Sequence, residues 1–406
     1  MFQIIINMYT NVIKSFILIC CVIVCVNSQS QEYNRANIWY FGRGAGLDFN
    51  SGQPVALYDG MLYSGGTSRG STAMSDTNGS LLFYTHGLRI WNQNHAIMDP
   101  IFMHSSYDVI SFPVPGSDHE YYVFSVPNYF PPASFGHSYY AIVDMTLNGG
   151  LGGVSEPVKI DAAWDADQKI GATRHKNKKD IWVIIRKIKD EQYAAFLVTQ
   201  DSVHSQPVLS HAPEYIEYSW GVAQLAGQIK VSYDKNYLVN SYRGGIWEQD
   251  ITDIIEVCIF DNVTGEVNYL YSFQLRDTSV SQRNFNTMGV EFSPDSKYLY
   301  LGAWIDGTDT GLVYQFDMQY FEDSASFIQS KILVGMGKRI YGLQLGRDGK
   351  IYITGRHEGL NATPYLSIIH DPWKHGVDCN FENEGIFLTP REGTGKLTNV
   401  LPDYLF

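Results

Sequence analysis

The chain has 406 residues, of which 45% are hydrophobic and 14% aromatic, and it carries 42 acidic against 29 basic side chains. A formal net charge of −13 argues against nucleic acid or an anionic membrane as the main partner. The abundance of Tyr (28), Phe (21) and Gly (37) is typical of many short strands separated by tight turns.

Residues 1–28 have the pattern of a secretory signal peptide. One basic residue, Lys14, precedes an apolar run over residues 16–26, and small or polar residues follow. The run is about 11 residues long, against the ~20 that cross a bilayer, so a retained membrane anchor is the weaker alternative. Cleavage is expected near Ser28, with Ser30 as an equal alternative, and leaves residues 29–406. This part has two cysteines, Cys258 and Cys379, which are too few for a disulfide scaffold.

A hairpin phrase then recurs along the chain: an apolar stretch, a polar turn, and an aromatic or aliphatic strand. It occurs at residues 72–87, 112–125, 172–185, 229–242, 289–304 and 342–355. The turn markers Asp76, Asp118, Lys178, Asp234, Asp295 and Asp348 lie 42, 60, 56, 61 and 53 residues apart. A strand-rich repeat of this period favours an all-β fold, a β-propeller of four-stranded blades, over a solenoid.

The mean interval predicts seven blades, although only six hairpins are found, and six or eight blades remain open alternatives. The seventh blade would be split between the chain ends. Short strands at residues 37–41 and 45–50 lack an upstream partner, and a strand at residues 397–406 lacks a downstream one. Pairing them would close the ring and remove two exposed edges. We find no interdomain linker, so residues 29–406 are predicted to form one domain.

Two pairs of stretches and the last residues carry a family resemblance. They are residues 38–57 (IWYFGRGAGLDFNSGQPVAL) with 74–98, residues 342–353 (GLQLGRDGKIYI) with 366–381, and residues 400–406 (VLPDYLF). Together they resemble the amino-terminal propeller of Bacteroidota cell-surface proteins associated with gliding motility and type IX secretion. Members usually continue into repeat domains and a carboxy-terminal sorting domain, whereas this chain stops at the closing strand. The resemblance implies an exported protein of the periplasm, the cell surface or the medium.

Four basic residues are candidates for ligand binding. Arg174-His175 and Arg356-His357 are expected at equivalent places near blade strands. On one rim of the ring they could bind a carboxylate, sulfate or acidic sugar, because Arg presents a planar fork of donors. The alternative is that they are solvated loop residues.

Two tryptophans, Trp247 and Trp373, lie in predicted turns. An exposed tryptophan can stack on a sugar ring or anchor a protein partner, and the alternative is packing within the loop.

The ligand-type residues His370, His375, Asp378 and Cys379 suggest zinc only superficially, because their spacing fits a turn better than a zinc site. Catalytic motifs are absent from the sequence. We therefore expect no catalytic residues, metal or cofactor, and predict a non-enzymatic binding module. Its expected partner is an envelope protein, a surface protein or a polysaccharide, and not nucleic acid. No membrane span is expected after cleavage of the signal peptide.

The alternative function is a propeller hydrolase or lactonase whose loops hold a metal in the central channel. Its candidate residues are Asp48, Asp76, Asp165, Asp234 and His175. A stoichiometric divalent ion in the purified protein would favour this alternative.

Overall fold

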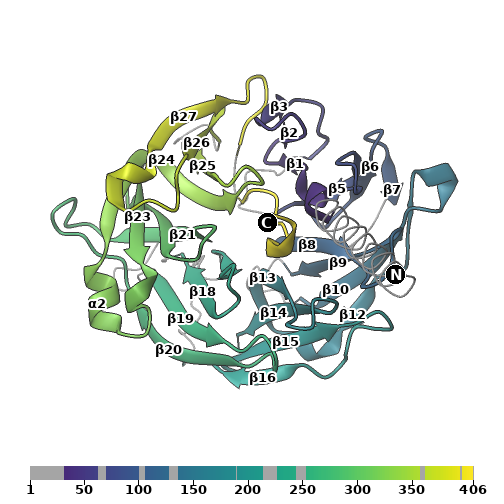
Figure 1. The fold of residues 1–406 in the computed structure, drawn as a ribbon, viewed down its shortest axis with the longest axis horizontal. Helices are drawn as coiled ribbons and strands as arrows, with labels where there is room; N and C mark the ends of the chain where they lie inside the picture. The colour runs from purple at the N-terminus through teal and green to yellow at the C-terminus, as the bar shows by residue number, and fades with distance from the viewer. Residues whose placement is uncertain are drawn as a thin grey trace, which may run out of the picture.

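The computed structural model describes residues 32–62, 70–99, 106–127, 136–188, 190–213, 226–243, 253–356, 362–393 and 396–405. In this part the strands form six antiparallel sheets, which follow one another in chain order around a centre, as in a β-propeller (Figure 1). The predicted signal peptide lies outside the described residues. Over the described ranges we find no helix whose length and hydropathy would let it cross a membrane.

The first three sheets cover the first half of the ring. The first has the order β1 (Ile38–Phe41), β2 (Ala45–Asp48) and β3 (Val55–Leu57). The second has the order β4 (Thr72–Ser75), β5 (Leu81–Thr85), β6 (Ile90–Asn92) and β7 (Ile97–Asp99). The third contains β8 (Asp108–Pro113), β9 (Glu120–Val126) and β10 (Ser138–Asp144), with β11 (Gly153–Val154) and β12 (Val158–Ile160) both paired to β10.

The next two sheets have four strands each. The fourth has the order β13 (Ala166–Arg174), β14 (Ile181–Lys187), β15 (Gln192–Val198) and β16 (Val208–His211). The fifth has the order β17 (Ile229–Val231), β18 (Tyr237–Tyr242), β19 (Ile254–Phe260) and β20 (Val267–Phe273).

The sixth sheet consists of two four-stranded units that share one long strand. Its order is β21 (Phe285–Phe292), β22 (Tyr298–Ile305), β23 (Thr310–Asp317), β24 (Ile332–Leu345), β25 (Ile351–Arg356), β26 (Tyr365–Ile369) and β27 (Phe381–Phe387). Strand β24 has 14 residues; its first half pairs with β23 and its second half with β25. The same strand is thus the outer strand of one unit and the inner strand of the next.

The helical segments with bounds in the described part of the chain are short. η1 (Asn34–Ala36) precedes the first strand and η6 (Pro402–Tyr404) follows the last one. The others lie between strands: η2 (Asn148–Gly150), η3 (Asp161–Ala163), η4 (Met318–Tyr320), α2 (Ser324–Gln329) and η5 (Gly376–Cys379).

The six predicted hairpins are confirmed, and the structure explains why their turns resemble one another. Asp76 accepts hydrogen bonds from the backbone N–H groups of Asn78 and Ser80, both at 2.8 Å. The residue that closes each tight turn adopts a left-handed conformation, with φ of 88° at Gly79, for example. Asp and Asn cap such turns because their short side chains reach the backbone two residues on. Four turn markers are therefore structural residues: Asp76, Asp234, Asp295 and Asp348.

Inner strands are buried along their whole length because neighbouring sheets cover both of their faces; all residues of β4, β8, β17 and β21 are buried. The last and first units pack against each other in the same way. Trp39 of β1 meets Tyr352 of β25 edge to face, with ring centroids 5.8 Å apart. The first and last units are therefore in contact at this junction.

The carboxy-terminal segment differs from the predicted closing strand. In the described residues 396–405 it forms no ladder with β1; it makes one parallel bridge, between Thr398 and Ser71, and ends in η6 near the centre of the ring (Figure 1). The Thr398 hydroxyl donates to the carbonyl of Tyr40 at 2.9 Å. The segment is thus tied to the first two sheets from the centre, and pairing of the terminal strands is not confirmed.

Candidate functional site

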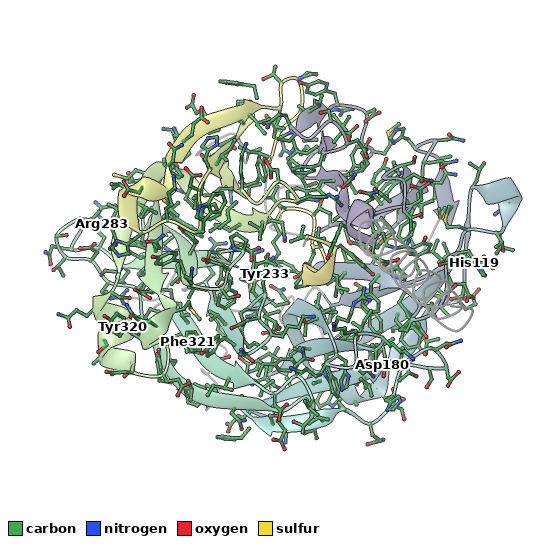
Figure 2. All side chains as sticks on the ribbon, viewed as in Figure 1. His119, Asp180, Tyr233, Arg283, Tyr320 and Phe321 are labelled. Atoms are coloured by element: carbon green, nitrogen blue, oxygen red, sulfur yellow. The ribbon has the colours of Figure 1, made fainter. Side chains whose placement is uncertain are left out.

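A groove with a volume of about 220 Å³ lies between two hairpins of neighbouring sheets. We call it the hairpin groove. One wall consists of residues 113–118, from the end of β8 and the turn that leads to β9. The other consists of Arg174, Lys178, Lys179 and Ile181 at the β13–β14 hairpin. Glu32, Arg35 and Tyr404, from the two ends of the described chain, also line the groove. Figure 2 shows His119 and Asp180, which follow the lining residues of the two hairpins, in the same part of the ring and Arg283 on the opposite side.

The hairpin groove is basic although the chain is acidic. Its lining includes four basic side chains and two acidic ones, Glu32 and Asp118, while the whole chain has a net charge of −13. Lys178 and Lys179 are exposed at the rim, and Arg35 is only 3% exposed. A concave surface with an excess of positive charge raises the local concentration of anions. This groove therefore favours anions.

Arg35 is anchored at the base of the groove by two partners. Its Nε donates to both carboxylate oxygens of Glu32 at 3.2 Å, and its Nη2 donates to Glu32 Oε1 at 3.2 Å. Its Nη1 donates to the hydroxyl of Tyr121 on β9 at 3.1 Å. The guanidinium fork of Arg35 thus already holds a carboxylate.

Arg174, a candidate from the sequence, lines the groove at the end of β13. Its Nη1 donates to the carbonyl of Lys178 at 3.2 Å, which fixes the side chain across its own turn. Its Nη2 lies 3.9 Å from Glu32 Oε2, and its guanidinium lies 5.9 Å from the ring centroid of Tyr404. The fold therefore brings Arg174 and Arg35 to the same carboxylate.

His175, the next residue, has a structural role and points away from the groove. The N–H of Asn177 donates to its Nδ1 at 2.9 Å, so the ring proton is on Nε2, which donates to the carbonyl of Val263 at 3.1 Å. The ring also contacts Trp182, with centroids 5.6 Å apart. His175 thus links the fourth sheet to the β19–β20 turn of the fifth and does not line the groove.

The expectation that the two Arg-His pairs occupy equivalent places is wrong. Arg174 adjoins the β13–β14 hairpin, whereas Arg356 ends β25 at the end away from the β24–β25 hairpin. Arg356 Nη1 donates to the hydroxyl of Tyr341 at 3.1 Å. His357 and Trp247 lie outside the described residues.

Trp373 is 43% exposed in the turn between β26 and β27. Two buried side chains hold this turn: Tyr300 donates its hydroxyl to the carbonyl of Pro372 at 2.9 Å, and Gln315 donates to the carbonyl of Lys374 at 2.7 Å. The turn therefore presents an exposed aromatic ring on a fixed backbone, but Trp373 does not line the hairpin groove.

Sequence reasoning missed most of the groove. Lys178 entered only as a turn marker, and the basic run at residues 176–179 could have identified this hairpin. No local signal identifies Arg35 or Glu32, because they lie about 140 residues before Arg174 and the fold alone brings them there.

The residues named for a metal-dependent hydrolase do not converge. Asp48 and Asp234 cap their own turns, accepting from the N–H groups of Asn50 at 2.7 Å and Asn236 at 3.3 Å. Asp165 lies 3.7 Å from Lys187. His370, one of the ligand-type residues considered for zinc, pairs with Glu382 at 2.7 Å. In the described ranges no three His, Cys, Asp or Glu side chains are grouped so that they could hold a metal ion.

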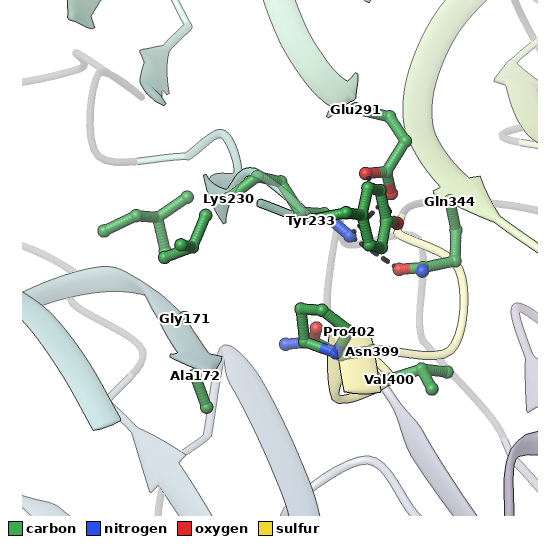
Figure 3. A pocket seen from close by; sticks show the side chains of 11 residues that line it. Gly171, Ala172, Lys230, Tyr233, Glu291, Gln344, Asn399, Val400 and Pro402 are labelled. Carbon is green, nitrogen blue, oxygen red and sulfur yellow. Dashed lines mark hydrogen bonds and ion pairs between the residues drawn. The ribbon is translucent and has the colours of Figure 1, made fainter. Parts of the chain in front are cut away.

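The centre of the ring is filled by buried ion pairs and by the carboxy-terminal segment. Lys230 Nζ lies 3.0 Å from Glu291 and donates to Gln344 at 2.6 Å, while Asn399, Val400 and Pro402 close the space beside them (Figure 3). The remaining cavity has a volume of about 10 Å³. That is room for about one water molecule. This part of the centre therefore has no space for a substrate.

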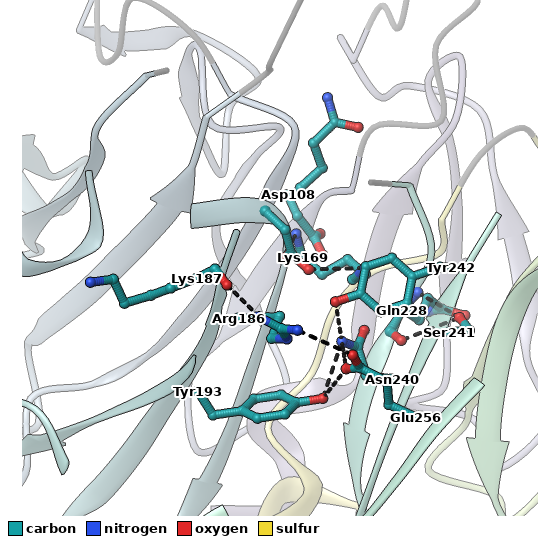
Figure 4. A network of polar contacts seen from close by, with 12 residues as sticks. Asp108, Lys169, Arg186, Lys187, Tyr193, Gln228, Asn240, Ser241, Tyr242 and Glu256 are labelled. Carbon is teal, nitrogen blue, oxygen red and sulfur yellow. Dashed lines mark hydrogen bonds and ion pairs between the residues drawn. The ribbon is translucent and has the colours of Figure 1, made fainter. Parts of the chain in front are cut away.

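A second buried network lies between the fourth and fifth sheets (Figure 4). Arg186 pairs with Glu256 at 3.4 Å, and Asn240 donates to the same carboxylate at 2.9 Å. Lys169 pairs with Asp167 at 2.9 Å, and both side chains are fully buried. Burial lowers the pKa of Lys169 to about 8 and raises that of Asp167, each against the attraction of its partner. The Arg186–Glu256 pair connects the fourth and fifth sheets, whereas the Lys169–Asp167 pair lies within β13.

One buried carboxyl gives a pH-dependent prediction. Burial raises the pKa of Asp253 from 3.8 to about 7, although Thr287 and Arg276 donate to it. Between those two pH values the folded protein binds a proton that the unfolded chain has released. The free energy of unfolding that this group contributes therefore falls as the pH rises from about 4 to about 7, and it is constant above that.

Substitution of Asp253 by asparagine removes this titration. We expect the stability difference, Asp253→Asn minus wild type, to grow by about 1 kcal/mol or more between about pH 4.5 and pH 7.5, measured by urea unfolding. A difference that is equal at the two pH values would show that the carboxyl titrates normally.

Comparison of the chain with known proteins finds similar solved structures but no family. No protein-family model matches it, and no curated protein matches it. Among solved structures, a functionally unknown protein from Desulfotomaculum acetoxidans is similar, with a TM-score of 0.47 and 11% identity over 90% of this chain and 99% of that one. The periplasmic gluconolactonase of Pseudomonas aeruginosa gives a TM-score of 0.37 at 10% identity over 77% of this chain and 92% of that one. The Dos1 propeller gives a TM-score of 0.43 at 10% identity over 77% of this chain and 69% of that one. Likeness at this level does not bear on activity or ligand.

Proposed function

We propose that the chain is an exported, non-enzymatic binding module of the bacterial cell envelope, a closed seven-bladed propeller whose hairpin groove binds an acidic sugar of an envelope polysaccharide. Seven units are obtained when β24 is divided between its two partners and the three-stranded first sheet is counted as a blade. The signal-peptide pattern of residues 1–28 and the family resemblance support the envelope location.

The observation that carries the proposal is the gathering of Arg35, Arg174, Lys178 and Lys179 around a 220 Å³ groove in an acidic protein. Arg binds carboxylates through two parallel hydrogen bonds, which gives geometric selectivity as well as energy. Drug-sized ligands occupy pockets of roughly 300–1,000 Å³, so this groove suits a smaller group, such as one charged sugar ring of a longer chain.

Titration calorimetry with a tetrasaccharide of glucuronic acid tests the proposal. We expect the wild type to bind this tetrasaccharide and to show no measurable binding of the neutral glucose tetrasaccharide. Arg174→Gln should weaken binding about 10- to 100-fold, since a hydrogen bond to a charged group contributes about 1.5–3 kcal/mol. The matched control is Arg283→Gln, which removes one positive charge on the opposite side of the ring (Figure 2).

Three results would contradict the proposal. Equal binding of the charged and neutral sugars would exclude recognition of the anion. Equal effects of Arg174→Gln and Arg283→Gln would move the site out of the groove. Tighter binding of an oligoglutamate peptide than of the glucuronate tetrasaccharide would make the partner an acidic protein segment.

A further inference from the structure

We infer that Glu32 is an internal competitor of the ligand: its carboxylate occupies the place on Arg35 and Arg174 that the ligand's carboxylate takes. This inference rests on the proposed function and adds how the same groove is regulated. The geometry supplies the first argument, because the two guanidinium groups that face the groove from different elements, η1 and β13, both face Glu32, at 3.2 Å and 3.9 Å.

The burial of the pair shows which partner can leave. The side chain of Arg35 is 3% exposed, whereas that of Glu32 is 38% exposed. Arg35 is also held from behind by the Tyr121 hydroxyl, and that hydroxyl donates to the carbonyl of Asp118 at 3.2 Å. Rotation of Glu32 toward solvent would leave Arg35 in place with its Nε and Nη2 directed at the vacated position. Arg35 is therefore a fixed receptor, and Glu32 is a displaceable occupant.

The chemistry of exchange explains the expected effect. A ligand carboxylate that replaces Glu32 on Arg35 exchanges one charge-assisted pair for another, so Arg35 contributes little net free energy of binding in the wild type. Without the Glu32 charge, Arg35 and Arg174 lose their carboxylate partner, and a ligand then supplies the missing one. The buried guanidinium of Arg35 is destabilising without a carboxylate partner, so a ligand that supplies one gains binding free energy.

The test compares two variants that remove one negative charge each from the same groove. In Glu32→Gln the charge is lost beside Arg35; in Asp118→Asn it is lost at a rim position whose side chain makes no hydrogen bond to either arginine. With the glucuronate tetrasaccharide we expect Glu32→Gln to bind about 10-fold more tightly than the wild type, and Asp118→Asn less than about 3-fold more tightly. Glu32→Ala removes the charge together with the polar end of the side chain, and it should increase the affinity as Glu32→Gln does.

The outcomes separate this inference from the proposed function. If the wild type binds through Arg174 but Glu32→Gln and Glu32→Ala bind no more tightly, Glu32 is a structural partner of Arg35 and the inference is wrong while the groove remains a binding site. If neither the wild type nor the Glu32 variants bind the tetrasaccharide, the proposed function itself is wrong. Binding by the variants alone would support the inference most strongly.

Discussion

Replacement of Lys396 by methionine is expected to lower the free energy of unfolding by about 3–5 kcal/mol, the range found when one partner of a buried ion pair is removed. Lys396 Nζ lies 2.6 Å from Asp108 Oδ2, and the two side chains are 3% and 4% exposed. The ammonium also donates to the carbonyl of Gln168 at 3.3 Å. The substitution would leave the Asp108 carboxylate buried and without its cation, and it would release the carboxy-terminal segment from β8.

Urea unfolding followed by tryptophan fluorescence measures this loss. The control is the double variant Asp108→Asn with Lys396→Met, which removes both charges and should recover most of the lost stability. If the double variant is as unstable as Lys396→Met alone, the loss comes from packing and the ion pair contributes little.

Arg186→Met is the second substitution with a large expected effect, again about 3–5 kcal/mol. Arg186 bridges the fourth and fifth sheets: its Nη2 lies 3.4 Å from Glu256 Oε1 and donates to the carbonyl of Pro213 at 2.9 Å. Glu256 is 4% exposed and would keep two neutral hydrogen-bond donors, the hydroxyl of Tyr193 and the amide of Asn240.

Thermal unfolding of two variants separates the effect of the buried charge from that of side-chain packing. One is Arg186→Met, and the other is the double variant Arg186→Met with Glu256→Gln. The second variant should melt at a higher temperature than the first, because the amide keeps the hydrogen bonds without a buried charge. The reverse order would show that the carboxylate is stabilised by Tyr193 and Asn240 alone.

The repeated hairpins could be predicted because their cause is local. Each turn needs a capping side chain and a left-handed residue within about five positions, so the pattern is visible in the sequence as Asp76 with Gly79 or Asp348 with Gly349. The carboxy-terminal segment could not be predicted in this way. Its hydrophobic residues, such as Leu397 and Leu401, are buried equally well beside the centre and in a closing strand, so the pattern does not distinguish the two.

The candidate site was predicted only at Arg174. That residue lies next to a turn whose position the repeat defines, whereas Arg35 and Tyr404 come from the ends of the chain and meet it only after the ring has formed. The choice between Arg174 and His175 also depends on the fold, because neighbouring residues at the end of a strand point to opposite faces. Sequence spacing therefore located one wall of the groove and not its base.

Hydrogen–deuterium exchange of the purified protein with and without the glucuronate tetrasaccharide tests the central claim most directly, because it locates the ligand without a substitution. Binding in the hairpin groove predicts slower exchange in peptides that cover residues 114–118 and 174–179, with no change around Arg283. Protection confined to other hairpins, or to the turn that carries Trp373, would show that the groove is not the binding site.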